Sequence, residues 1–491
     1  MPHKKILAAL SLILAMVGLL ITFSEQLTRN IIELTGRLLQ QSLDYHFWSI
    51  GLSHAGVELI LLAAISISFI LFYDKKRATV LIAASLACIC LFLYYILRDS
   101  VNIPFHDDYF FLEFLNNYSS TPRSADIFMQ DNESRLIFMK LLSILLYYMH
   151  AFNFKTLVII ANLCLVGSAA ILYRSIQLKS DQKLLLGLAL TVGIFQFQYY
   201  DSEVWASGAL YSSCTLFFSF LSIGLMHSQR RYAFWASLVT AIVSVSICGA
   251  GFLILSIGSI VFVSQKKIKE SIVWISASVI CVLLYFNNYS SVYGNYSTTI
   301  APDLIAEKII SCFPFSCTFL GGSAQFFYQI YIPFLLGLSV WAFLFFLTYK
   351  KYYSKHPSIY LMLLFICLSS LIPPLLRNDF DVSQALHVHY GIYSVMALSC
   401  CLIALMEIIK EPAQMPCLKI ILPLTVAFHL MTGVFFYPEV VLRKEQLIQM
   451  AHDFNKTGKA TMPPPYSKYV PERAVYLFNS CADKNIYHLP E

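Results

Sequence analysis

The chain of 491 residues is poor in charge and rich in apolar side chains. Charged residues make up 13% of it and hydrophobic residues 58%, whereas an ordinary soluble domain has about 25% charged residues. A water-soluble core cannot absorb that much apolar surface, so the composition excludes a soluble globular protein. The formal net charge of +6 lies mostly in short connections between apolar blocks, which indicates membrane topology and not nucleic-acid binding.

The first apolar block, residues 6–23, follows Met1–Lys5. It is longer than the apolar core of a secretory signal peptide and no small-x-small cleavage site follows it, so we expect a retained first span. Further blocks along the chain are long enough to cross about 30 Å of hydrocarbon as helices. We therefore expect an all-α polytopic membrane protein of about thirteen spans. The expected spans are 6–23, 56–73, 79–97, 156–173, 183–199, 206–226, 232–248, 250–264, 270–287, 327–348, 358–376, 390–408 and 418–436.

Lysine and arginine occupy every second connection between these spans, which predicts a cytoplasmic N-terminus. Examples are Lys75–Arg77, Lys266–Lys269 and Lys350–Lys355. The opposite side then holds the long segments, above all residues 98–155. Within that loop, Leu136–Tyr148 is expected to lie as a helix at the outer interface, because a further crossing would reverse the charge alternation.

The chain is thus expected to have two parts. Residues 1–436 form the membrane domain with its large outside loop. Residues 437–491, which include the run Met462–Pro465, form a small, turn-rich outside tail.

Two adjacent carboxylates, Asp107 and Asp108, follow the third span, with His106 and Tyr109 on either side. Neighbouring carboxylates in a partly desolvated cleft can act as a general base or bind a divalent cation. The alternative is a solvated pair that caps the helix starting at Tyr109. We take Asp107 and Asp108 as candidate catalytic residues and His106 and Tyr109 as candidate substrate-binding residues.

Four more acidic or basic residues on the same side are candidates for substrate binding. Glu133 and Arg135 precede the interfacial helix, where an arginine can hold a lipid phosphate, pair with a catalytic carboxylate or simply extend to the interface. Asp201 and Glu203 lie in a very short loop. They either contribute to the same cleft or form a plain polar turn.

A second cluster, which contains Arg377, His389 and Tyr390, comes just before a late span. A cation and an imidazole at that depth suit a phosphate-bearing substrate, and a self-paired loop is the alternative. Cys248–Gly251 forms the bend between two short apolar spans. Its small residues allow a ligand to approach, or serve only as a hairpin corner.

Several common motifs are absent from the sequence. There is no P-loop, no GxGxxG after a strand, no HExxH and no GxSxG, so nucleotide-driven transport, dinucleotide chemistry, zinc hydrolysis and serine-hydrolase chemistry lack support. The spans are nearly free of charge, which disfavours a transporter, because charges inside a membrane usually mark a transport pathway.

Four short motifs together resemble the GT-C superfamily of membrane glycosyltransferases. They are Phe105–Tyr109, Asn132–Arg135, Gly249–Gly251 and His389–Ser394. Within that superfamily the chain is most similar to bacterial O-antigen glucosyltransferases of the serotype-converting kind. The overall plan of spans and loops extends the resemblance over most of the chain.

The resemblance implies inverting transfer of a hexose, glucose above all, from a polyprenyl-phosphate donor to a lipopolysaccharide O-antigen or related glycan. Asp107 or Asp108 would be the general base, and Arg135, Arg377 or His389 would stabilise the leaving phosphate. The expected place is the bacterial inner membrane, with the site on its outer face. No cofactor is implied with certainty, and a divalent cation stays open.

Two other functions stay open at this point. An O-antigen polymerase or ligase would share the outside loops but would depend on arginines more than on an acidic base. A lipid or polysaccharide transporter is the third alternative.

Overall fold

The computed structural model describes residues 2–39, 41–131, 134–289, 312–327, 329–376, 381–459 and 471–490. These residues form helices, turns and loops and contain no strand, which confirms the all-α prediction. The chain divides into two compact units. Unit 1 comprises Met1–Asp99, Ile176–Tyr200 and Met406–Gln446, and unit 2 comprises Ser100–Ser175, Asp201–Leu405 and Leu447–Glu491.

Within the described ranges, nine helices are long and apolar enough to cross a membrane. They correspond to nine of the predicted spans. The first predicted span is α1 (Pro2–Phe23), which bends by 92° into α2 (Glu25–Leu39) and counts at most as a tenth. The other three are α8 (Ser180–Ile194), α12 (Ala233–Ile247) and α13 (Phe252–Ser264). Helices of that length measure roughly 20 to 23 Å, less than the hydrocarbon thickness of about 30 Å, so the structure does not confirm thirteen spans.

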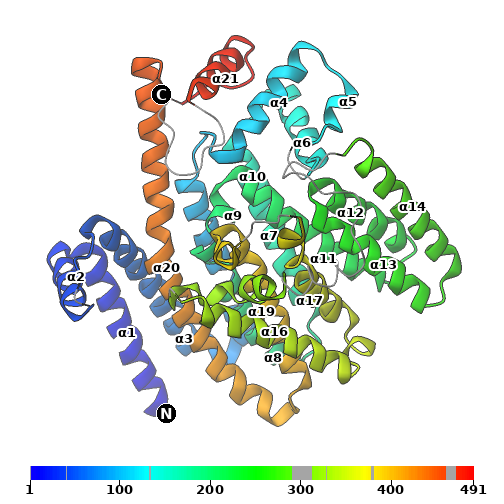
Figure 1. The fold of residues 1–491 in the computed structure, drawn as a ribbon. Coiled ribbons are helices and arrows are strands. Elements are labelled where there is room, and N and C mark those ends of the chain that lie inside the picture. The colour runs from blue at the N-terminus through cyan, green and yellow to red at the C-terminus, as the bar shows by residue number, and fades with distance from the viewer. Residues whose placement is uncertain are drawn as a thin grey trace. The chain divides into compact units, whose positions relative to one another are not determined.

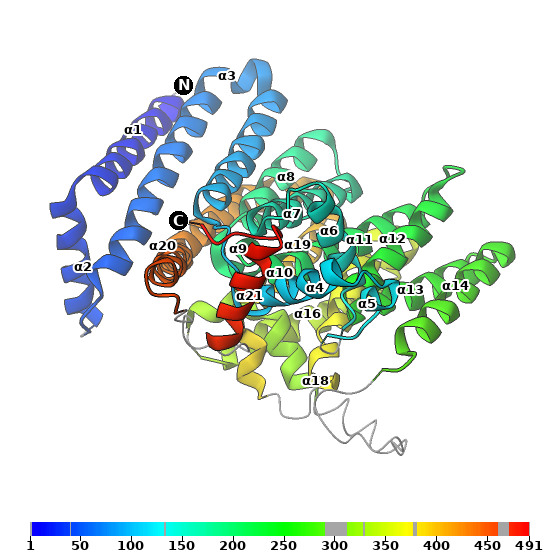
Figure 2. The ribbon, with the colours of Figure 1, turned by 90° about the horizontal axis from the view of Figure 1, so that it is seen from above.

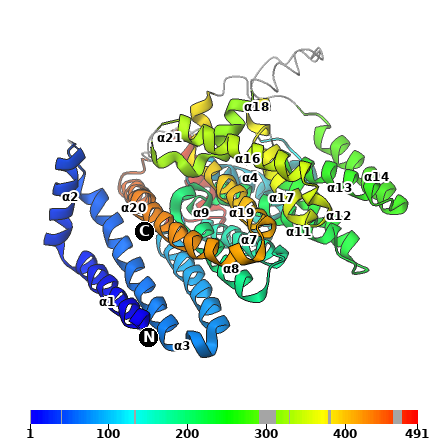
Figure 3. The same ribbon diagram turned by 90° about the horizontal axis from the view of Figure 1, so that it is seen from below.

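Unit 1 is built on α1 and the long helix α3 (Tyr45–Asp99), which lie side by side (Figures 2 and 3). Lys76 interrupts α3 with φ −142° and ψ 41°, so α3 consists of two spans joined in the basic segment that the sequence predicted as a connection. Gly18 of α1 and Gly56 of α3 pack so closely that a Cβ on either would collide with the other's backbone. Gly51 of α3 meets the backbone of α20 (Glu411–Thr457) in the same way. Small residues bring these spans into direct backbone contact, as is usual for helices in membranes.

Unit 2 contains most of the remaining helices (Figure 1). In chain order they are η1 (His106–Asp108), α4 (Tyr109–Ser120), α5 (Ser124–Ile127), α6 (Ile137–Tyr148), α7 (Phe154–Ser175), α9 (Asp201–Val204), α10 (Ala206–Ala209), η3 (Leu210–Cys214), α11 (Thr215–Met226), α12, η4 (Gly249–Gly251), α13, α14 (Ile268–Phe286), η5 (Gly322–Phe327), α16 (Tyr331–Tyr349), η6 (Tyr352–Ser354), α17 (Pro357–Ser369), α18 (Ile372–Leu376), η7 (Val382–Leu386), η8 (Val388–Tyr390), most of α19 (Gly391–Ile408) and α21 (Pro471–Asp483).

Helices α11 to α14 pack in sequence order as a row within unit 2 (Figure 1). Trp274 of α14 covers Gly258 of α13, and its indole N–H donates to the carbonyl of Leu255 over 2.9 Å. A short polar group at the end of a large buried ring thereby fixes the register of two helices. The amphipathic helices α4 and α6 contact each other, and α21 packs on α4.

The described part of the predicted tail, residues 437–459 and 471–490, is mostly helical. Helix α20 continues through Tyr437 and ends at Thr457, and α21 follows at Pro471–Asp483. At 1.5 Å per residue, the 47 residues of α20 extend about 70 Å, roughly twice what a membrane span needs. The run Met462–Pro465, which suggested turns, lies outside the described residues.

Candidate functional site

Unit 2 contains a cavity of about 940 Å³ whose walls come from segments far apart in the sequence. Its lining includes four of the predicted site residues, namely His106, Asp107, His389 and Tyr390. Gly249 of the predicted hairpin corner also lines it. Ser134 of the Asn132–Arg135 motif lines it as well, so all four sequence motifs that suggested a site contribute to this one cavity.

The acidic motif, Phe105–Tyr109, contributes His106 and Asp107 to the cavity lining. His106 has φ 51°, a left-handed conformation that is uncommon outside glycine. The carboxylate of Asp107 lies 3.3 Å from Nδ1 of His106, and its side chain is 30% exposed. A non-glycine residue held in this conformation turns the chain sharply, so Asp107 faces the cavity.

Asp108 has a different environment from its neighbour. It is 2% exposed, and its Oδ1 accepts hydrogen bonds from the backbone N–H of Ser207 over 2.7 Å and from the Ser207 hydroxyl over 2.6 Å. Its Oδ2 accepts from the N–H of Phe105 over 3.2 Å. The predicted alternative of a solvated, helix-capping pair is wrong for Asp108, which is buried and makes no side-chain bond to the start of α4. It fastens the acidic motif to α10 instead.

Burial also changes the charge of Asp108. It raises the pKa of this carboxyl from 3.8 to about 7, although the bonds from Ser207 and Phe105 favour the charged form. The carboxyl therefore titrates near neutral pH. Since its two oxygens are already engaged, its position next to the cavity suits holding the motif and not reacting with a substrate.

Aromatic rings surround the acidic motif. The indole of Trp205 lies 5.1 Å from the ring of His106 and 6.3 Å from that of His389, measured between centroids. Its buried N–H has no hydrogen-bond partner among the described residues. The ring of Tyr390 lies tilted against that of His389 with centroids 4.1 Å apart, and it contacts the ring of Phe319 at 4.9 Å. Trp205 was not predicted from the sequence, although it follows directly on the Asp201–Val204 turn.

Lys140 is a second residue that the sequence did not reveal as part of the site. It lies in the apolar run of α6, is 1% exposed and lines the cavity. Its Nζ lies 2.6 Å from Oδ2 of Asp131 and donates to the carbonyls of Met129 over 2.6 Å and Asp126 over 3.3 Å. An ammonium group has three N–H donors, so this lysine holds the loop before α6 against the helix.

Arg135 is placed away from the cavity lining. Its guanidinium donates to the carbonyl of Tyr285 over 2.5 Å and to those of Phe128 and Asn287. Two of these carbonyls stand at the C-terminal end of α14, where a cation is favourable. The geometry thus gives Arg135 a structural contact, and its predicted substrate role stays a prediction.

Three further predicted residues also lie outside the cavity lining. Tyr109 is fully buried, with its ring against Phe478 of α21 at 5.7 Å. Asp201 and Glu203 open the short helix α9. Glu203 is fully buried, neither of its carboxylate oxygens has a hydrogen-bond partner among the described residues, and burial raises its pKa well above its usual range.

The two glycines of the Gly249–Gly251 bend have different surroundings. A Cβ on Gly251 would collide with the backbone of Ser244, so this glycine is needed for the corner. A Cβ on Gly249 would meet open space, and Gly249 lines the cavity.

The remaining predictions concern Glu133, Arg377 and a divalent cation. Glu133 and Arg377 lie outside the described residues. Over the described part of the chain, no group of three or more His, Cys, Asp or Glu side chains is arranged to hold a metal ion.

Comparisons of the chain with models of protein families, with curated proteins and with solved structures found no match.

Proposed function

We propose that the chain is a GT-C-like membrane glycosyltransferase that moves a hexose from a polyprenyl-phosphate donor to a hydroxyl of a glycan. One observation carries the proposal: the Asp107 carboxylate faces a cavity of about 940 Å³. Pockets for small molecules have volumes of roughly 300 to 1,000 Å³, so this one has room for a sugar and part of its phosphate.

The lining of the cavity supports a sugar as ligand. Rings such as Trp205, Tyr211 and Tyr390 offer flat apolar faces, and Asn117 and Glu113 offer polar groups for hydroxyls. Sugars present both kinds of surface, with C–H groups on one face and hydroxyls around the edge. A purely lipidic ligand would not need the polar half of this lining.

Asp107 is the proposed general base. It would take the proton from the acceptor hydroxyl as that oxygen forms its bond to the anomeric carbon, while the bond from that carbon to the phosphate oxygen breaks. The electron pair leaves with the phosphate, which needs positive charge and not a proton. Arg123, Lys484 and His389 line the same cavity and are the candidates for that role.

The orientation belongs to the same proposal. Basic residues at Lys76 and around Lys350 favour the cytoplasmic side for those turns. The acidic motif then faces the outer side of a bacterial inner membrane, where a polyprenyl-phosphate sugar is the available donor. The short helices α8, α12 and α13 would complete the thirteen predicted spans.

The test is sugar transfer in proteoliposomes that contain the full chain, a radiolabelled polyprenyl-phosphate hexose and a glycan acceptor. Asp107→Asn should reduce transfer by about 10²- to 10⁴-fold, the usual contribution of a general base. Asp483→Asn is the matched control, because Asp483 is exposed at the end of α21 and is not part of the cavity. Wild-type transfer by a correctly inserted Asp107→Asn chain would refute the proposal.

A further inference from the structure

Three titratable side chains meet inside unit 1, within helices long enough to span a membrane. They are His54 and Glu58 in the Tyr45–Ser68 span and His429 in α20. Their side chains are 1%, 9% and 13% exposed. The expectation that the spans are nearly free of charge therefore misses a buried group. Ionisable residues inside a membrane are costly and usually functional.

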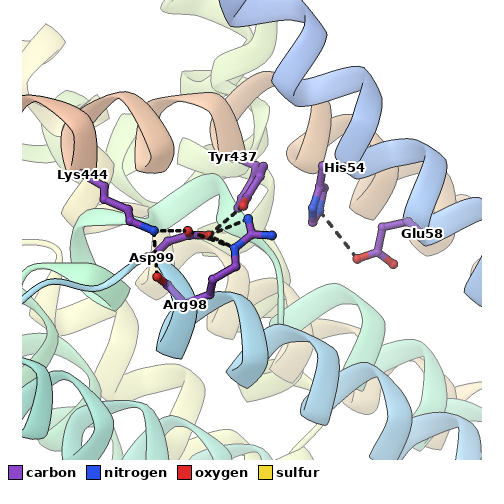
Figure 4. Close-up of polar contacts among 6 residues, drawn as sticks. All are labelled: His54, Glu58, Arg98, Asp99, Tyr437 and Lys444. Atoms are coloured by element: carbon purple, nitrogen blue, oxygen red, sulfur yellow. Dashed lines mark hydrogen bonds and ion pairs between the residues drawn. The ribbon is translucent and has the colours of Figure 1, made fainter. Parts of the chain in front are cut away.

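Both imidazoles face the same carboxylate oxygen. Nε2 of His54 lies 3.6 Å from Oε1 of Glu58 (Figure 4), and Nε2 of His429 lies 3.4 Å from it. Nδ1 of His429 lies 3.0 Å from the carbonyl oxygen of Val192 in α8. A carbonyl only accepts, so this Nδ1 carries a hydrogen. One further proton, shared between Nε2 of His429 and the carboxylate of Glu58, then completes the hydrogen bonding between these two side chains.

His54 is the member of the cluster that is left with unused hydrogen-bonding capacity. Neither ring nitrogen has a hydrogen-bond partner among the described residues. The ring stacks on Tyr437 with centroids 4.3 Å apart and meets the ring of Tyr95 at 4.6 Å. It also fills the space above Gly433 of α20, where a Cβ would collide with it. The imidazole is thus held in place by packing while its nitrogens keep the ability to bind a proton.

A row of side chains connects this cluster with the exposed surface of unit 1 (Figure 4). The Tyr437 hydroxyl donates to Oδ2 of Asp99 over 2.7 Å. Asp99 also pairs with Arg98 at 2.9 Å and Lys444 at 3.1 Å, whose side chains are 42% and 27% exposed. The Tyr437 ring stacks on His54, so Tyr437 and Asp99 lie between the cluster and Lys444, the cation of this row that can release a proton.

The surrounding charges limit how many protons the cluster holds. Glu58 can neutralise one imidazolium, and the positive charge of Arg98 disfavours a second one. Tyr95 and Cys88 are the other titratable neighbours from α3, and they are neutral near physiological pH. These charges favour a single imidazolium in the cluster.

We propose that His54, Glu58 and His429 form an intramembrane proton-binding site, which exchanges one proton with the surface along Tyr437 and Asp99. The ligand is a proton from water, and no other reactant is needed. The proposal does not depend on sugar transfer, because every residue that carries it belongs to unit 1.

The test is ¹⁵N NMR of the histidine rings in the full chain, reconstituted in lipid nanodiscs and titrated between about pH 5 and 9. His54→Gln and His429→Gln assign the signals. We expect one proton to titrate in the cluster, Glu58→Gln to abolish that titration, and His46→Gln to leave it unchanged. His46 is the matched control, since it lies on the same helix with its side chain 60% exposed. Constant ring signals from His54 and His429 in the wild-type chain would overturn the proposal, whether or not any variant folds.

The route is tested separately with Tyr437→Phe, which keeps the ring and removes the hydroxyl. We expect the titration to persist while proton exchange at the cluster, measured by exchange spectroscopy, becomes slower. Tyr94→Phe is the control, because Tyr94 is exposed beside the same arginine. An unchanged exchange rate in Tyr437→Phe would reject the route.

Discussion

The two units each bury a carboxylate, and the partners of these carboxylates differ. Asp108 in unit 2 accepts hydrogen bonds from Ser207 and Phe105, which are neutral and do not titrate near neutral pH. Glu58 in unit 1 faces two imidazoles, which do. Fixed neutral donors hold a carboxylate in place, whereas titratable partners let it share protons. Asp108 is therefore assigned to positioning the acidic motif, and Glu58 is assigned to binding a proton.

The largest expected loss of stability concerns the wall of the cavity. Lys140→Met keeps most of the side-chain volume but leaves the partly buried Asp131 carboxylate without its cation, which should cost about 3 kcal/mol of unfolding free energy. Lys484→Met is the control, because Lys484 also lines the cavity but is exposed. Denaturant unfolding should show a clearly larger loss of unfolding free energy for Lys140→Met than for Lys484→Met. Similar losses in both would contradict a structural role peculiar to Lys140.

The pH dependence of stability tests the environment of Asp108. The pKa of Asp108 is about 7 in the folded chain, whereas its ordinary value, which we take for the unfolded chain, is 3.8. At a pH between these two values, the folded chain keeps a proton that the unfolded chain has released. Stability should then fall as pH rises through this interval, by up to about 1.4 kcal/mol per pH unit, and become level above it. Asp108→Asn should remove the part of this slope that Asp108 contributes, and Asp483→Asn should keep it. Unfolding at about pH 5 and about pH 8 measures both.

A smaller effect is expected from the hydroxyl that holds Asp108. Ser207→Ala removes one of two hydrogen bonds to Oδ1 and keeps the backbone N–H, so it should cost about 1 to 2 kcal/mol. Ser212→Ala is the control within the same wall, because the Ser212 hydroxyl donates to the carbonyl of Gly208 in its own helix over 2.7 Å. If both variants unfold alike, the Ser207 contact does not anchor the motif.

The sequence was sufficient to predict the helical class, most of the candidate spans and four segments of the cavity wall. Hydrophobic length identifies a span whatever its partners are, and the basic residues at Lys76 correctly marked the break in α3. His106, Asp107 and His389 could be predicted because they stand where chains leave apolar spans.

The features that the sequence did not predict depend on contacts between residues that are distant in sequence. Nothing local distinguishes Asp107 from Asp108, since the difference comes from Ser207. Lys140 reads as a single charge in an apolar run until Asp131 is seen beside it. His54 and Glu58 look like isolated polar residues until α20 brings His429 to them.

The most direct test of the account compares Asp107→Asn with Asp108→Asn in the same transfer assay, with kcat and KM determined for each. If Asp107 is the base and Asp108 a positioning residue, Asp107→Asn lowers kcat by about 10²- to 10⁴-fold at a nearly unchanged KM. Asp108→Asn should keep measurable turnover. A wild-type kcat in Asp107→Asn, or a complete loss of turnover in Asp108→Asn alone, would contradict the assignment of Asp107 as the general base.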